Sequence, residues 1–171
     1  MLTRPQKDEY GGHFSHYVEL VPEGDLLTLL EEQNREAAQL FSTFAEEQAN
    51  DSYAPGKWTL KELLSHAIDT ERIMTARLHR IARGDEAEQP GFNQDIYTAH
   101  AHANRLSLSF LIDELAAVRS STLFLLRGIP EEEWKRTAQV SGYRISARAL
   151  AYVVQGHLLH HLNVVRDRYR L

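Results

Sequence analysis

Residues 145–169, ISARALAYVVQGHLLHHLNVVRDRY, place three histidines within five positions of an otherwise apolar helical pattern. On an α-helix, side chains four positions apart lie on one face, offset by about 40°. His157 and His161 therefore share an apolar face, and His160 lies beside it. Burying a histidine is costly unless its nitrogens are used. The stretch predicts a buried helix that carries a pair of candidate metal ligands.

Helical spacing of apolar residues recurs in three further stretches. Thr59 and Glu62 match the capping box that begins a helix, and Gly84 and Gly128 supply C-terminal stops. No stretch shows sustained alternation of β-branched residues, so we expect no sheet. Four helices of this length fit an all-α four-helix bundle. Their expected ranges are about 25–48, 59–83, 107–127 and 146–169.

The connection between the second and third helices, residues 85–105, is long for a compact domain, and we expect a short helix inside it. Residues 131–134 are expected to form one helical turn and residues 141–144 a tight turn. Residues 1–21 are interpreted as a polar N-terminal segment, and residues 22–171 as the bundle domain.

The composition limits the classes of function. The chain has 171 residues, a formal net charge of -5 and scattered basic residues, which disfavours a nucleic-acid partner. It contains no cysteine, so thiolate ligands, disulfides and a cysteine nucleophile are excluded. No apolar run approaches the ~18 residues that span a bilayer, and the beginning of the sequence lacks an apolar signal core. We expect a cytoplasmic protein with no membrane partner.

Two imidazoles leave a metal site incomplete, because catalytic zinc usually takes three protein ligands and keeps one position open. His66 is the candidate third ligand, since it shares an apolar face of the second helix with Thr70. A zinc peptidase needs a Glu after the first His of the pair, and Leu158 stands there, so that class is excluded. A site without metal, built of ordinary core histidines, remains the alternative. The other histidines are expected on the surface: His13, His16, His79, His100 and His102.

Three segments carry a resemblance to a known family: 57–73 (KWTLKELLSHAIDTERI), 83–92 (RGDEAEQPGF) and 145–169. With them the chain resembles the DinB/YfiT-like superfamily of four-helix bundles with a three-histidine site. The resemblance implies that His66, His157 and His161 bind one divalent metal ion, zinc or nickel, and that the protein is a homodimer. His160 matches no ligand position, and packing or hydrogen bonding beside the site is its expected role.

Three neutral imidazoles leave the ion its full charge, so it can lower the pKa of a bound water or bind a thiol as thiolate. Characterised members of the superfamily include thiol S-transferases and isomerases that use low-molecular-weight thiols. The resemblance therefore implies transferase-like or hydrolase-like chemistry on a small molecule, with a low-molecular-weight thiol as candidate cosubstrate. The alternative is a non-catalytic metal-binding or stress-associated protein.

Asp69 lies three residues after His66 and is the candidate catalytic or orienting carboxylate, with a solvated helix carboxylate as the alternative. Asn104 and Arg105 follow the long connection and are candidates to hold an anionic substrate group. Trp58 and Trp134 are expected to pack at helix ends.

Overall fold

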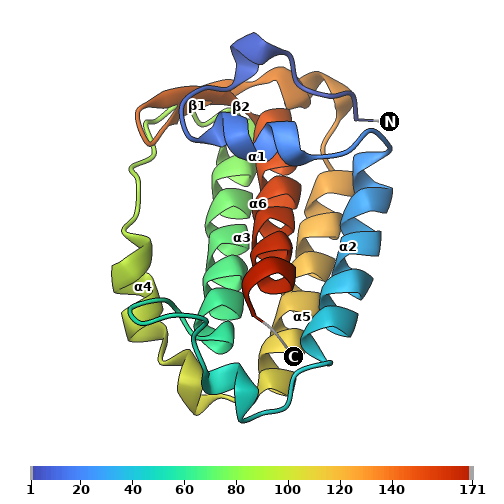
Figure 1. Cartoon of the computed structure of the whole chain (residues 1–171). Coiled ribbons are helices and arrows are strands. Elements are labelled where there is room, and N and C mark those ends of the chain that lie inside the picture. Colours follow the sequence, from blue (N-terminus) through green and yellow to red (C-terminus); the bar gives the residue numbers. More distant parts are fainter. Residues whose placement is uncertain (1, 170–171) are drawn as a thin grey trace.

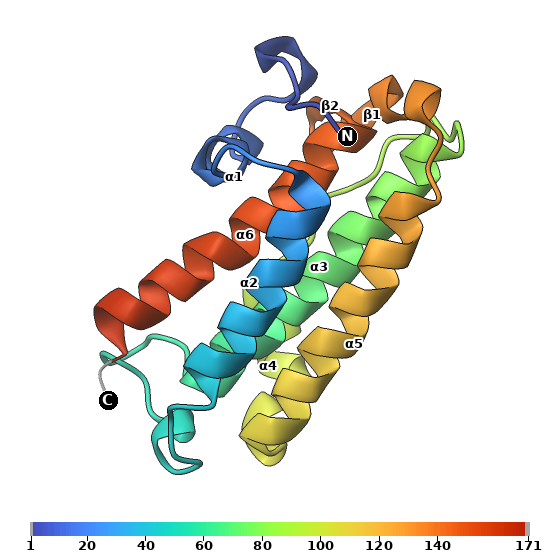
Figure 2. The ribbon, with the colours of Figure 1, turned by 90° about the vertical axis from the view of Figure 1, so that its right-hand side faces the viewer.

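Four long helices pack side by side in the computed structural model, which describes residues 2–169 (Figure 1). The second and the first of these helices each contact both the third and the fourth, so the four close into a bundle. The view turned by 90° shows the same arrangement (Figure 2). The predicted bundle is confirmed, and its helices are α2 (Leu26–Phe41), α3 (Leu60–Ala82), α5 (Leu108–Arg127) and α6 (Ala147–Arg168).

The helix starts agree with the predicted caps. Thr59 Oγ1 accepts from the Glu62 amide, and the Glu62 carboxylate accepts from the Thr59 amide, which completes the capping box. The end of α2 differs, because the helix stops at Phe41 rather than near Gln48. The hydroxyls that follow it, on Ser42 and Thr43, donate to carbonyl oxygens of the last turn at 2.7 and 2.6 Å. Such local bonds compete with the helical ladder.

A small hairpin contradicts the expectation that the chain contains no sheet. Strand β1 (Thr137–Val140) pairs with β2 (Tyr143–Ser146) in antiparallel register. Ser141 and Gly142 form the two-residue loop with φ of 52° and 83°, as hairpin turns require. The predicted tight turn is therefore present, but each strand has only four residues, too few to show a sustained alternation. A 3₁₀ turn, η4 (Glu131–Lys135), precedes the hairpin as expected.

The N-terminal part differs from the polar segment expected for residues 1–21. After a 3₁₀ turn, η1 (Lys7–Glu9), it forms α1 (Phe14–Leu20), which packs across α6 (Figure 1). Phe14 and Val18 are fully buried. The helix has four apolar residues, Phe14, Tyr17, Val18 and Leu20, but a pattern of seven residues is too short to stand out from the polar residues around it.

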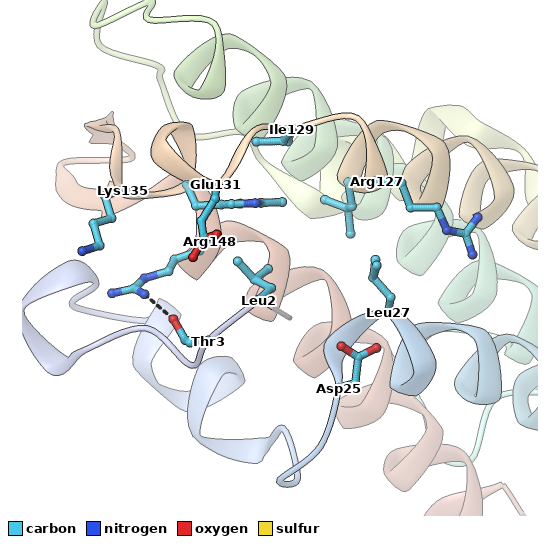
Figure 3. A pocket seen from close by; sticks show the side chains of 11 residues that line it. Leu2, Thr3, Asp25, Leu27, Arg127, Ile129, Glu131, Lys135 and Arg148 are labelled. Carbon is cyan, nitrogen blue, oxygen red and sulfur yellow. Dashed lines mark hydrogen bonds between the residues drawn. The ribbon is translucent and has the colours of Figure 1, made fainter.

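Polar contacts fasten this N-terminal part to the start of α6. Glu9 accepts from Ser146 Oγ at 2.8 Å and from Arg148 Nε at 2.6 Å. Thr3 Oγ1 accepts from Arg148 Nη1 at 2.7 Å. Beside these contacts lies a cavity of about 340 Å³, lined by Thr3, Arg148 and residues of α2 and α5, and by none of the histidines (Figure 3).

The long connection between α3 and α5 contains the expected short helix. It is α4 (Gln94–Ala101), capped by Asn93 and followed by a 3₁₀ turn, η3 (Ala103–Arg105). Helix α4 lies against α3 on the outside of the bundle (Figure 1). Within residues 2–169, no helix combines the length and the apolar character that crossing a bilayer requires.

A buried polar layer divides the apolar core of the bundle into two clusters. Arg119 of α5 has no exposed surface and makes a two-point ion pair with Glu71 of α3, at 2.9 and 2.8 Å. Its Nη1 group donates to the Leu30 carbonyl and to Gln33 Oε1 of α2. Gln33 in turn donates to the Gln155 carbonyl of α6 at 2.9 Å. All four helices of the bundle are thus joined at one level.

Replacing Arg119 by Met should leave the buried Glu71 carboxylate without a counter-charge. We expect the free energy of unfolding in urea to fall by about 3–5 kcal/mol, the usual cost of breaking one partner of a buried pair. The double variant Arg119→Met, Glu71→Met removes both charges and should recover a large part of that loss. A loss under about 1 kcal/mol in the single variant would show that buried Glu71 does not need Arg119 as its counter-charge.

Candidate metal centre

Three histidine side chains meet between α3 and α6. His66 comes from α3, and His157 and His161 from neighbouring turns of α6. Their ligand atoms lie within 4.8 Å of one another, and each residue is less than 9 % exposed. The Nε2 atom of His157 is 3.2 Å from the Nε2 atoms of both His66 and His161. The structure therefore brings together all three histidines that the sequence selected.

Hydrogen bonding alone does not satisfy this arrangement. An imidazole nitrogen offers either one N–H or one lone pair, so His157 Nε2 can bond only one of the two nitrogens it faces. A single ion at the centre would use the lone pairs of all three. Two ligands at 2.0–2.1 Å from a tetrahedral zinc ion lie about 3.3 Å apart, close to the observed 3.2 Å. The donor set and its spacing fit a divalent cation.

The histidines are held neutral. Burial lowers the pKa of His66 to about 4, against a smaller opposing effect of Asp95. Burial also lowers the pKa of His157 and of His161 well below the ordinary value, and the neighbouring histidines act in the same direction. Near neutral pH all three imidazoles therefore have lone pairs free for a metal.

Aromatic rings fix the orientation of two of the ligands. The ring of Trp58, just before α3, lies 4.7 Å from the ring of His66. The ring of Tyr17 on α1 meets that of His157 edge-on at 5.1 Å. Tyr17 can come so near because α6 has a glycine, Gly156, beneath the α1 backbone: a Cβ atom there would lie 1.9 Å from the Tyr17 carbonyl oxygen.

The histidine cluster opens to two cavities. One of about 240 Å³ is lined by His66 and His157, and one of about 420 Å³ by His160 and His161. Gln94, at the start of α4, lines both. In the described part of the chain, the group of possible metal ligands contains only the three histidines. An ion held there would keep a position open toward the cavities, as catalytic rather than structural zinc does.

The other candidate residues are not brought to the cluster. Asp69 is directed toward Arg72, at 3.6 Å, on the side of α3 where Arg72 also pairs with Glu114 of α5. The reason is geometric, because three positions rotate the side chain about 60° away from His66. Asn104 hydrogen-bonds Thr59 and Glu62 and so supports the N-terminus of α3, and Arg105 is exposed.

The histidines expected on the surface are exposed, as predicted for all five. One of them has a partner that the sequence did not indicate. His16 Nε2 lies 3.4 Å from His160 Nδ1, so α1 places a second, exposed histidine pair beside the buried cluster. His160 is half-buried, and hydrogen bonding beside the site, its expected role, agrees with this contact.

Sequence reasoning missed several residues that line the smaller cavity. Tyr17 arrives on the unpredicted α1, and Gln94 and Phe92 on the long connection. Arg77 lies on the same face of α3 as His66, and this periodicity was the available signal. In the fourth helix, Gly156 was the signal for the close approach of α1, because glycine is a poor helix former and here lies in the middle of an apolar stretch.

The sequence model of the DinB superfamily matches residues 29–165. The chain belongs to the DinB superfamily. Among solved structures it is similar to YfiT from Bacillus subtilis, described as a probable metal-dependent hydrolase with an unusual four-helix bundle topology. The TM-score is 0.74 at 16% identity, covering 86% of this chain and 92% of YfiT. This likeness shows that the chain has the same four-helix bundle fold as YfiT.

A second similar structure is the mycothiol-dependent maleylpyruvate isomerase, with a TM-score of 0.67 at 16% identity. The match covers 83% of this chain but only 60% of the isomerase, and a histidine-to-alanine variant of that protein matches over the same shares. No curated protein matches at a significant level. At this identity the two structures support the fold of the DinB-like chain and not its substrate.

Gly156→Ala tests the close approach of α1 to α6. The new Cβ would clash with the Tyr17 backbone, so α1 must move, and we expect destabilisation of about 1–3 kcal/mol despite the better helix propensity of Ala. Hydrogen exchange should show faster exchange of the α1 amides. Gly11→Ala is the control, since its Cβ would lie at an ordinary 3.7 Å from Tyr143. Equal stability of both variants would contradict this packing.

Proposed function

We propose that this DinB-superfamily chain is a metal-dependent enzyme that binds one divalent ion through His66, His157 and His161 and acts on a small molecule. The observation that carries the proposal is the convergence of three neutral, buried Nε2 atoms beside two cavities. Zinc and nickel are the proposed ions, because both accept imidazole ligands.

Each surrounding residue has a part in this function. The three imidazoles supply lone pairs at neutral pH, and burial keeps protons from competing for them. Trp58 and Tyr17 limit rotation of the ligand rings and exclude water from their faces. A bound ion would act as a Lewis acid and lower the pKa of a water or thiol bound at its open coordination position.

Two reaction types are compatible with such a centre, transfer of a small thiol to an electrophile and hydrolysis. The structurally similar proteins are described as a mycothiol-dependent isomerase and a probable metal-dependent hydrolase, which supports both types. A low-molecular-weight thiol is the proposed cosubstrate for the first, since the chain has no cysteine of its own. We also propose that the protein is a homodimer, as the sequence resemblance implies, and that it acts in the cytoplasm, as expected from its composition.

The rival function is a non-catalytic metal-binding or stress-associated protein. A purely structural zinc ion is usually coordinated by four protein ligands, whereas only three potential ligands meet here among residues 2–169. This favours the enzyme. Asp69 stays a candidate base only if it leaves Arg72, with which it is paired.

Metal content tests the centre. Protein purified without an affinity tag should hold about one zinc or nickel ion per chain by elemental analysis. His66→Ala and His161→Ala should each weaken binding by more than about 100-fold, since even outer-shell partners of metal ligands are worth roughly 10–100-fold. His79→Ala, which alters an exposed histidine of the same α3 helix, should leave binding unchanged. Failure to bind any divalent ion, even on reconstitution, would refute the centre.

Turnover separates the enzyme from the binding protein. We expect the metal-loaded chain to conjugate small thiols to chlorodinitrobenzene or to hydrolyse nitrophenyl acetate. Chelation or His161→Ala should reduce the rate to that of the uncatalysed reaction, and added metal should restore the chelated protein. A rate that does not depend on the metal would contradict the proposed mechanism. Tight metal binding with neither activity would favour the non-catalytic alternative.

A further inference from the structure

Arg77 of α3 is a buried cation without a buried counter-charge. Its side chain is 6 % exposed, and among residues 2–169 no carboxylate forms an ion pair with it. The guanidinium donates one hydrogen bond, from Nη2 to the Pro90 carbonyl at 2.5 Å, and makes one weak contact, from Nη1 to Met74 Sδ at 3.6 Å. It also lies over the Phe92 ring, 5.7 Å from its centroid.

These contacts leave much of its bonding capacity unused. A guanidinium has five N–H donors in a planar fork that matches a carboxylate at two points. Burial lowers the pKa of Arg77, yet arginine stays charged in proteins. A buried charge that lacks a partner costs several kcal/mol, so an anion that enters beside it would remove that cost.

Arg77 shares a cavity with two residues of the candidate metal centre. Arg77 lines the same cavity of about 240 Å³ as His66 and His157. It follows His66 by eleven positions, about three helical turns, so both lie on one face of α3. Its contact with Met74 shows that the guanidinium folds back toward the histidines. With a rise of 1.5 Å per residue, the eight positions from 66 to 74 put the two groups on the order of 10 Å apart.

The cavity wall between them has a second unused polar group. Thr70 lies one turn after His66, is 2 % exposed, and lines this cavity. Its Oγ1 has no hydrogen-bond partner in the described part of the chain. A buried hydroxyl normally bonds to something, so a polar occupant of the cavity is expected here as well.

We propose that Arg77 binds a carboxylate group of the small molecule whose other end reaches the three histidines. This inference rests on the proposed function, because it defines the substrate class of the same site. A carboxylate is favoured because it matches the planar guanidinium at two points, and the unpaired Thr70 hydroxyl lines the same cavity. Arg77 would thus select anionic substrates of limited length.

The test measures binding, without turnover. The full chain is loaded with Co²⁺, whose absorption reports a thiolate ligand, and titrated with mercaptopropionate, mercaptobutyrate and mercaptohexanoate, each alongside its primary amide. At least one acid should bind roughly tenfold or more tightly than its amide, the usual value of a charge-assisted bond. In Arg77→Gln that preference should disappear, and the affinity for the amide should be unchanged.

Two further variants act as controls. Arg83→Gln removes an exposed arginine at the C-terminal end of the same helix and should keep the preference for the acid. Arg77→Lys keeps a charge without the planar fork and should retain part of it, which shows that the Gln variant did not act through misfolding.

Several results would overturn the inference. Equal affinity of acids and amides for the wild type would do so, as would an acid preference that survives in Arg77→Gln. An equal loss of both ligands in that variant would mean that Arg77 is only structural. These outcomes leave the metal centre intact, because the wild-type protein still shows thiolate binding through its Co²⁺ absorption. Failure of the chain to hold Co²⁺ would instead refute the proposed function, and this inference with it.

Discussion

The ion pair between Arg119 and Glu71 fixes the level at which the four helices meet, and the histidines depend on that level. Glu71 follows His66 by five positions on α3, and Gln155, which accepts from Gln33, precedes His157 by two on α6. In each helix the polar residue falls between the two apolar clusters. An apolar layer of similar volume could be equally stable. The polar layer adds register, because a shift of one turn would leave its charges unpaired.

Register matters because the proposed metal ligands come from two helices. The i,i+4 pair on α6 is set by helix geometry alone, but its distance to His66 depends on how α3 lies against α6. One helical turn corresponds to 5.4 Å, whereas the observed Nε2 separations are 3.2 Å. A bundle held only by interdigitating aliphatic side chains tolerates repacking. The hydrogen-bonded layer next to the site joins α3 to α5 and α2, and Gln33 of α2 joins it to the Gln155 carbonyl of α6.

Patterns of neighbouring residues predict most of the long helices and the histidine pair. They fail for features that depend on contacts between residues far apart in the sequence. The caps at Thr59, Ser107 and Ser146, and the spacing of His157 and His161, follow from neighbours within one turn, so they could be predicted. The α1 helix could not, because a helix of seven residues with two buried side chains is stable only against α6, where Gly156 makes room. The direction of Asp69 likewise depended on Arg72 and on α5, whose position no local pattern contains.

The bundle buries two arginines, Arg119 and Arg77, and the two differ in how many hydrogen-bond partners the fold gives them. Arg119 is fully enclosed and has a bidentate carboxylate, a carbonyl and an amide oxygen as partners, so its charge is compensated by the fold itself. Arg77 is nearly as buried but has one carbonyl and a thioether. The histidine cluster at the other end of the same cavity is also unsatisfied, since its facing nitrogens exceed what hydrogen bonds can use. The fold gives Arg119 four acceptors. Around one cavity it leaves Arg77 without a counter-charge, the Thr70 hydroxyl without a partner, and His66 and His157 with facing nitrogens that hydrogen bonds alone do not satisfy. These groups are in place for a ligand. The imidazoles would bind the proposed metal ion, and Arg77 would bind the proposed anion.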